Sequence, residues 1–111
     1  MTADESWRTE DTTALFDAIL LLRDQDEASR FFRDLCTLGE LHDMAQRWAV
    51  VRLLDRGMHY AEISNRTGAS TATITRIAQW LRHGEGGYIG ALERLRVASG
   101  QSPAPTGDST R

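Results

Sequence analysis

Short hydroxyl side chains and arginines are concentrated between residues 66 and 82, which makes this segment the best suited to chemistry with a polar partner. The residues concerned are Arg66, Ser70, Thr71, Ala72, Thr73, Thr75, Arg76, Gln79 and Arg82. Hydroxyl groups can hydrogen-bond to base edges or ordered water, threonine methyls can contact the thymine methyl, and arginines bind phosphate oxygens. These residue types in one short segment favour contact with double-stranded DNA.

Catalytic and metal-binding patterns are weak by comparison. His42, His59 and His83 have no cysteine or carboxylate at a spacing typical of a zinc site. No Ser–His–Asp set or pair of carboxylates falls on one expected element. The glycines at 84–87 follow no expected strand, so they do not resemble a phosphate-binding loop. The sequence therefore favours a protein that is not an enzyme and has neither a metal nor another cofactor.

The hydroxyl residues are expected to lie on the second helix of a helix-turn-helix at 60–81. The sequence predicts helices at 60–67 and 71–83 with a corner at Gly68, because glycine adopts the positive φ that a steep turn needs. Ser70 is a good N-cap for the second helix, and Ser64 is small enough for the two backbones to approach. The apolar contacts between the helices are expected from Ile63, Ala69, Ile74 and Ile77. The alternative is an ordinary helical hairpin in a core, which also turns at glycine.

Helical periodicity predicts four further helices. Asp11 and Thr12 can cap a first helix, and a second runs from about 27 to 36. Thr37 and Glu40 match a capping box that opens a long helix to about 56, and Gly57 ends it. A last helix is expected at 88–97. The apolar positions are Leu15, Ala18, Ile19 and Leu22, then Ala28, Phe31, Phe32 and Leu35, then Leu41, Met44, Ala45, Trp48, Val51 and Leu54, and finally Ile89, Leu92 and Leu95.

The expected fold is all-α, with about six helices in a single domain at 1–98, because neither a strand-like alternation nor a repeat occurs. Residues 99–111 are rich in Gly, Ser, Pro and Thr, which predicts a disordered tail. The polar, acidic start and the lack of an apolar run of about 18 residues predict no signal peptide and no membrane span, and therefore a cytoplasmic protein. The single Cys36 excludes an internal disulfide and is expected to be a buried small side chain.

Charge is distributed unevenly along the chain, whose formal net charge is −3. Residues 1–40 hold ten acidic and four basic side chains, a balance of −6, whereas residues 41–83 hold six arginines and three acidic side chains, a balance of +3. A locally basic segment is what contact with phosphate requires, whatever the charge of the whole chain. The acidic first forty residues leave open the alternative of a protein-interaction module that docks a partner.

The run Ala72-Thr-Ile-Thr-Arg76, preceded by Thr67-Gly68-Ala69, resembles the recognition region of the Trp repressor superfamily. The wider stretch 35–95 is similar to the YerC/YecD-type branch of that family. The resemblance implies an intertwined all-α homodimer with about six helices per chain and one helix-turn-helix per subunit. It also implies a transcription regulator, most simply a repressor, that binds a palindromic operator with half-sites about one DNA turn apart. A non-specific or transposase-like DNA-binding accessory protein is the nearest alternative.

The resemblance also implies a candidate effector site. In the tryptophan-binding members two arginines hold the effector, and with one residue deleted between Gly57 and Gly68 they fall on Arg47 and Arg76. Two converging guanidiniums would attract a carboxylate or phosphate of an unidentified effector. Otherwise they are surface arginines that pair with acidic neighbours or with DNA.

Two departures from the family pattern limit what can be transferred. A glycine follows the ATITR run in the tryptophan-binding members, but Ile77 stands there in this chain and would occupy the volume of the indole ring. We therefore expect that tryptophan is not the effector. The DNA-contacting position on the first helix of the motif falls near Ala61, which forms no side-chain hydrogen bond, so the operator sequence cannot be transferred. Trp48 and Trp80 lie on apolar faces and are expected in the core or a dimer contact.

Overall fold

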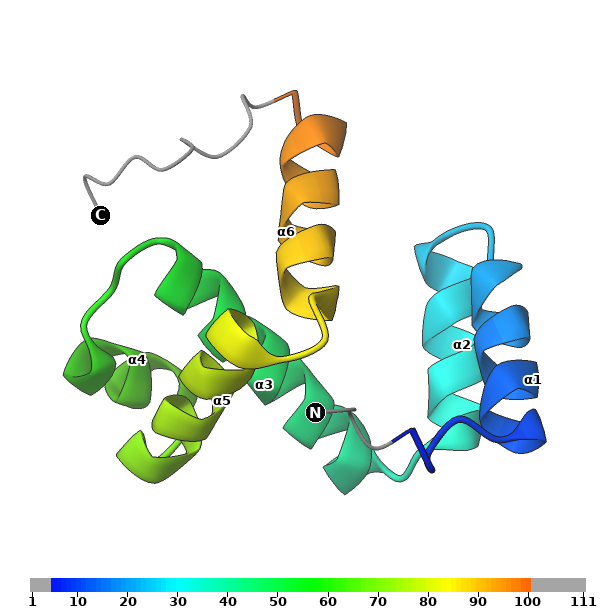
Figure 1. The fold of residues 1–111 in the computed structure, drawn as a ribbon, viewed down its shortest axis with the longest axis horizontal. Coiled ribbons are helices and arrows are strands. Elements are labelled where there is room, and N and C mark those ends of the chain that lie inside the picture. The colour runs from blue at the N-terminus through cyan, green and yellow to red at the C-terminus, as the bar shows by residue number, and fades with distance from the viewer. Residues whose placement is uncertain (1–4, 101–111) are drawn as a thin grey trace. The chain divides into compact units, whose positions relative to one another are not determined.

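The computed structural model describes residues 5–100, which form six helices and no strand (Figure 1). The helices are α1 (Glu10–Leu20), α2 (Gln25–Leu35), α3 (Leu38–Asp55), α4 (Tyr60–Thr67), α5 (Thr71–His83) and α6 (Gly87–Ala98). This confirms the predicted all-α class. None of the helices described is long and apolar enough to cross a membrane. Apart from Ser99 and Gly100, the predicted tail at 99–111 lies outside the described residues.

The chain divides into two compact units, Met1–Leu41 and His42–Arg111. In the first unit, the Thr9 hydroxyl accepts from the Thr12 N–H at 3.1 Å, and the Thr12 hydroxyl accepts from the Thr9 N–H at 2.8 Å. This capping box starts α1 at Glu10, so the cap lies earlier than the predicted one at Asp11 and Thr12. Asp24 likewise caps α2 and starts it two residues before the predicted position at 27.

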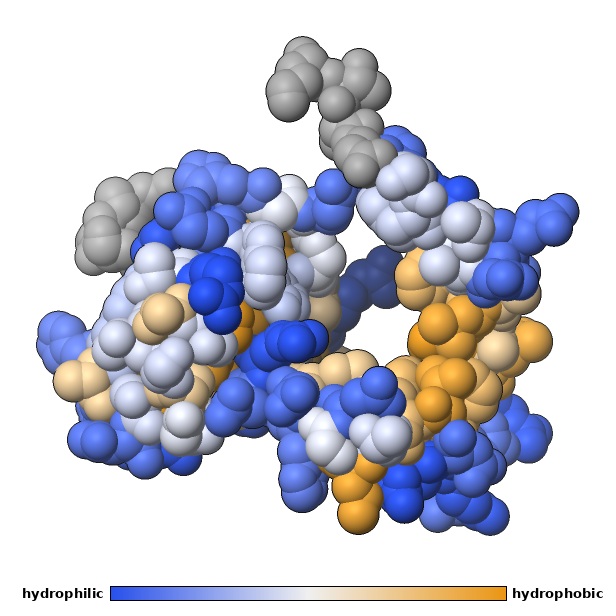
Figure 2. All heavy atoms as spheres, turned by 90° about the horizontal axis from the view of Figure 1, so that it is seen from below, coloured by the Kyte–Doolittle hydropathy of each residue, from blue (hydrophilic) through white to orange (hydrophobic). Residues whose placement is uncertain are grey.

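Within residues 5–41 no side chain is fully buried. The predicted apolar positions of α1 and the Phe31–Phe32 edge-to-face pair are only half-buried. Other large apolar side chains are exposed, and Leu20 retains 81% and Leu21 78% of its accessible surface. Figure 2 shows hydrophobic side chains on the surface of this unit. Cys36 is half-buried rather than buried as predicted, because two helices alone provide no third layer to cover it.

The second unit contains the hydrophobic core of the chain. Its buried members are Val50, Val51, Ile63, Ala69, Ile74, Ile77 and Leu92. Successive residues of a helix point about 100° apart, so the complete burial of both Val50 and Val51 means that the covered face of α3 is broad. The predicted stripe of α3 included Val51 but not Val50, because the predicted periodicity assumes a narrower covered face.

Of the three predicted apolar positions of helix α6, one is buried in the core. Leu92 is buried, whereas Ile89 and Leu95 remain 46% and 51% exposed, so the prediction that all three point inward is wrong for this chain by itself. Near its end, the Arg96 guanidinium donates to both carboxylate oxygens of Asp55 at 2.7 and 2.6 Å. This half-buried ion pair joins α6 to the end of α3.

Candidate nucleic-acid interface

The turn between α4 and α5 has the geometry that the sequence predicts. Gly68 has φ 80° and ψ 0°, and its N–H donates to the Ser64 carbonyl at 2.9 Å, which ends α4. The four predicted apolar contacts of the motif are all buried: Ile63, Ala69, Ile74 and Ile77. The predicted N-cap is also confirmed, since the Ser70 hydroxyl accepts from the Thr73 N–H at 3.1 Å. Residues 60–81 therefore form a helix-turn-helix.

Two polar residues for which the sequence predicted no structural role hold this turn in place. The Thr67 hydroxyl donates to the Ile63 carbonyl at 2.8 Å and accepts from the Ala69 N–H at 3.1 Å. The Gln46 side-chain amide donates to the Thr67 carbonyl at 3.0 Å. This last bond ties the turn to α3 across 21 positions of sequence, a separation for which no local pattern gives a signal.

One face of α5 carries most of the side chains predicted to contact DNA. Ile74, Ile77 and Ala78 point into the core. Thr71, Ala72, Thr75, Arg76 and Gln79 are exposed, and Thr73 is half-buried. Because residues four apart in a helix are neighbours, Thr71, Thr75 and Gln79 form one row and Ala72 and Arg76 form the next. The structure therefore brings these residues together as a continuous polar face.

The hydroxyls of this face already form hydrogen bonds within α5. Thr75 donates to the carbonyl of Thr71 at 2.9 Å. The Ser70 and Thr73 hydroxyls are hydrogen-bonded to each other at 3.1 Å, and the Arg76 guanidinium donates to the Thr73 hydroxyl oxygen at 3.4 Å. The side chains are thereby restricted in rotation, as is expected of groups that contact a partner in one orientation.

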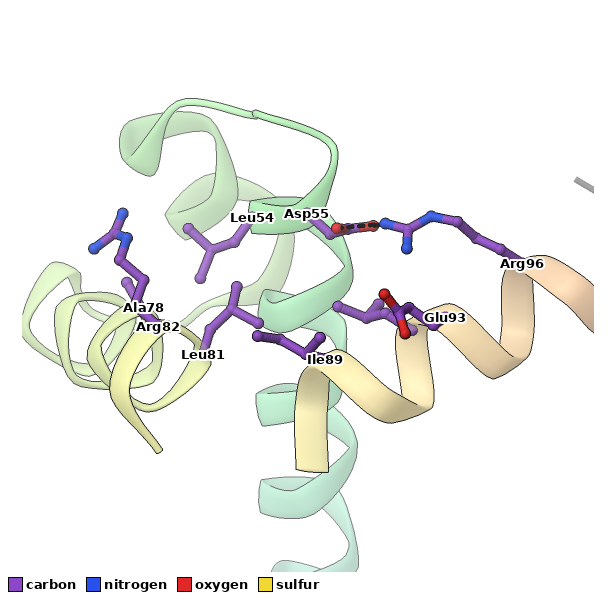
Figure 3. Close-up of a pocket in the computed structure, with 9 residues that line it drawn as sticks. Leu54, Asp55, Ala78, Leu81, Arg82, Ile89, Glu93 and Arg96 are labelled. Carbon is purple, nitrogen blue, oxygen red and sulfur yellow. Dashed lines mark hydrogen bonds and ion pairs between the residues drawn. The ribbon is translucent and has the colours of Figure 1, made fainter. Parts of the chain in front are cut away.

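The two arginines expected at the edges of the interface differ in their surroundings. Arg66 lies on α4, where its guanidinium is 3.5 Å from the exposed Glu62 carboxylate. Arg82 lies at the exposed end of α5 and lines a cavity of about 310 Å³ between α3, α5 and α6. In Figure 3 the Arg82 guanidinium points away from the Asp55–Arg96 ion pair at the other side of this cavity. Both cations are available to phosphate, since the pair at Arg66 is exposed and weak.

Arg47 and Arg76 line a single cavity of about 220 Å³ between α3 and α5. The other lining residues are Asp43, Gln46, Thr73, Ile77 and Trp80, of which Asp43, Gln46 and Trp80 were not predicted here. Asp43 and Trp80 could have been found, because each lies four residues from one of the arginines. Within residues 5–100 neither arginine forms an ion pair, so both charges are free to meet an anion.

The two tryptophans predicted to lie in the core or a dimer contact, Trp48 and Trp80, have different environments. Trp48 packs against the core and lies 6.2 Å from the Tyr88 ring, as predicted. Trp80 is 50% exposed, so within this chain it is not a core residue. A contact with a second copy remains the prediction for it.

Comparison with known proteins reveals close relatives. Residues 10–96 match the family described as Trp repressor protein. The chain is 43% identical over 95 residues to YerC of Bacillus subtilis (strain 168), an alignment that covers 86% of this chain and 91% of YerC.

Two solved structures share the fold. One is a TrpR-like protein from Eubacterium eligens ATCC 27750, with a TM-score of 0.79, 42% identity, and coverage of 83% of this chain and 95% of the other. The second is a candidate Trp repressor from Staphylococcus aureus, with a TM-score of 0.80, 38% identity, and coverage of 87% and 97%. These findings confirm the resemblance inferred for 35–95, and the family match extends it to α1 and α2.

Proposed function

The chain belongs to the Trp repressor family, and we propose that it is a sequence-specific transcription regulator that binds double-stranded DNA through α5. The observation that carries this proposal is the exposed polar face of α5, held by a glycine turn with φ 80° and by four buried apolar contacts. A short helix with threonine and alanine side chains can enter the major groove without steric conflict. Arg66 and Arg82, at the two sides of this face, would contact phosphates.

We further propose that the regulator is a homodimer. The first unit leaves Leu20, Leu21 and Phe16 exposed and buries no side chain within residues 5–41, so it lacks the core that a folded unit requires. Full burial of one leucine contributes about 1.5–3 kcal/mol, which makes a second copy that covers these side chains strongly favourable. The acidic balance of 1–40 and the basic balance of 41–83 also attract each other between copies. A two-fold dimer would present two α5 helices to a palindromic operator and would act as a repressor by occupying it.

We propose that tryptophan is not the effector that the cavity between Arg47 and Arg76 holds. Ile77 is 1% exposed and fills the side of the cavity next to α5. Asp43 adds a carboxylate to the wall and would oppose an anionic ligand. The arginines therefore serve either another small anion or the phosphates of DNA.

Selection of bound duplexes from a random DNA pool tests the proposed function. The expected result is one palindromic sequence, bound by two subunits and preferred over random competitor, with affinity that falls steeply as salt rises. Equal affinity for every duplex would instead indicate a non-specific accessory protein. Binding of no duplex at low salt would favour the protein-interaction module.

A further inference from the structure

Arg76 belongs both to the polar face of α5 and to the cavity between α3 and α5. It is exposed beside Ala72 on the face proposed to contact DNA, and it lines the cavity together with Arg47. Its hydrogen bond to the Thr73 hydroxyl is long, at 3.4 Å, and no carboxylate of residues 5–100 pairs with either arginine. The Arg76 guanidinium is therefore available to an anion in the cavity as well as to a DNA phosphate.

The charges of the cavity wall favour a small oxyanion. Arg47 and Arg76 supply two positive charges and Asp43 one negative charge, so the wall has a formal balance of +1. A guanidinium binds the oxygens of a phosphate or carboxylate through two parallel N–H donors. Gln46 and Thr73 add neutral polar groups to the same wall. The lining thus matches a compact ligand that carries a phosphate or carboxylate group.

An oxyanion in this cavity would compete with DNA for the same guanidinium. A bidentate pair occupies the donors of Arg76 and neutralises the charge that attracts a DNA phosphate. Because coupling between two binding events is reciprocal, the ligand weakens DNA binding by the factor by which DNA weakens ligand binding. The cavity is therefore coupled negatively to the α5 face.

We propose that the cavity between α3 and α5 binds a small phosphate- or carboxylate-bearing ligand that releases the protein from DNA. The ligand acts by drawing Arg76 away from the DNA backbone, so it weakens operator binding rather than strengthening it. This inference rests on the proposed function and deepens it, since it names the class of the ligand and the direction of its effect.

The size of the effect follows from the phosphate contact that is lost. Each contact contributes about 0.9 to the slope of log affinity against log salt concentration. At about 0.15 M salt, one contact therefore accounts for about 5.5-fold in affinity. Loss of the Arg76 contact in both subunits of a dimer should weaken operator binding by about thirtyfold and reduce the salt slope by about two.

Inorganic phosphate and acetate are the probes that test this proposal. Each is titrated into the complex with the selected operator, followed by fluorescence anisotropy, while chloride keeps the ionic strength constant. Operator affinity should fall by up to about thirtyfold with at least one probe, and the probe that acts assigns the oxyanion. Arg47→Gln should lose this response, because it removes one of the two guanidiniums that hold the ligand and leaves Arg76 on the α5 face.

Arg52→Gln is the matched control. Arg52 is likewise an exposed arginine of α3, but it lines a different cavity, between α3 and α6. This variant should respond to the probe as the wild type does. Asp43→Asn should respond at a lower probe concentration, because it removes the like charge from the wall. The response is the ratio of affinities with and without the probe, so a change in basal affinity does not enter, and thermal unfolding checks that each variant is folded.

The outcomes separate this inference from the function on which it rests. A wild-type operator affinity that neither probe lowers, or that falls equally in Arg47→Gln, overturns the ligand site and leaves the regulator intact. An affinity that rises with the probe overturns the direction of its effect. Failure to select any duplex overturns both the inference and the proposed function.

Discussion

Replacing Gly68 by alanine tests whether the corner of the helix-turn-helix depends on backbone conformation alone. At φ 80° an L-residue is disfavoured by about 1–2 kcal/mol, and the alanine side chain returns about 0.4–1 kcal/mol by restricting the unfolded chain. A Cβ at this position would meet only the Gln46 side-chain nitrogen, at 3.8 Å, which is ordinary contact and adds no clash. The expected net loss is therefore at most about 1.6 kcal/mol and centred near 0.8 kcal/mol. At roughly 4–8 °C per kcal/mol, the central value lowers Tm by about 3–6 °C.

Gly57→Ala is the matched control for this prediction. Gly57 has nearly the same conformation, with φ 79°, and a Cβ there would meet nothing within 4 Å. Its loss of stability should therefore equal that of Gly68→Ala. The two variants should differ in DNA binding, because only strain at Gly68 is relieved by moving α5 relative to α4.

Thermal unfolding and a gel shift with the selected operator, run well below both midpoints, measure the two effects. Gly68→Ala should lower Tm and weaken operator binding by up to about tenfold, the equivalent of 1.4 kcal/mol. Gly57→Ala should lower Tm alone. Gly68→Asn should recover part of both losses, since asparagine tolerates this conformation. Wild-type stability and binding in Gly68→Ala, beside a destabilised Gly57→Ala, would refute the reasoning.

The remaining predictions concern the contacts around the motif. Arg96→Met should lower the unfolding free energy in urea by about 1.5–3 kcal/mol because it leaves the half-buried Asp55 carboxylate unpaired, whereas Arg94→Met, on the exposed side of α6, should change little. In analytical ultracentrifugation, Leu20→Asp should shift the protein from a dimer to a monomer or unfold it. An unchanged dimer would contradict the proposed interface. Asp17→Asn, on the same helix, is the control and should leave the dimer unchanged. Gln46→Glu replaces a donor to the turn by an acceptor and should cost about 1–3 kcal/mol in urea, with faster amide exchange at the turn, and wild-type values would show that the bond is dispensable. Tryptophan at millimolar concentration should leave Tm unchanged, and a clear upward shift would show that the cavity does hold it.

The helix-turn-helix could be predicted because everything that defines it is local. The bounds Tyr60–Thr67 and Thr71–His83 agree with the predicted 60–67 and 71–83. A glycine corner, a serine cap and isoleucines three residues apart act within one or two turns of helix, where sequence patterns carry most of their information.

Contacts between distant segments could not be predicted in the same way. Periodicity marked Ile89 and Leu95 as apolar and hence suited to burial, but it does not say what would cover them, and within one chain they stay 46% and 51% exposed. The Asp55–Arg96 ion pair spans 41 positions and consists of residue types that are common on surfaces. For the candidate site, the polar face followed from the spacing within α5, whereas the bond from Gln46 to the turn depended on coordinates.

Helix α3, rather than the recognition helix, determines where the motif is held. Gln46 binds the turn, Arg47 lines the cavity shared with Arg76, and Val50 and Val51 are completely buried in the core that includes Ile63 and Ile74. Positions 46, 47, 50 and 51 follow the i, i+1, i+4, i+5 spacing of a single helix face, so one side of α3 holds the whole motif. A substitution at Gln46, Val50 or Val51 would therefore move α5 without altering any residue proposed to touch DNA. Substitutions at these α3 positions should therefore change how firmly α5 is held, while base preference stays with α5.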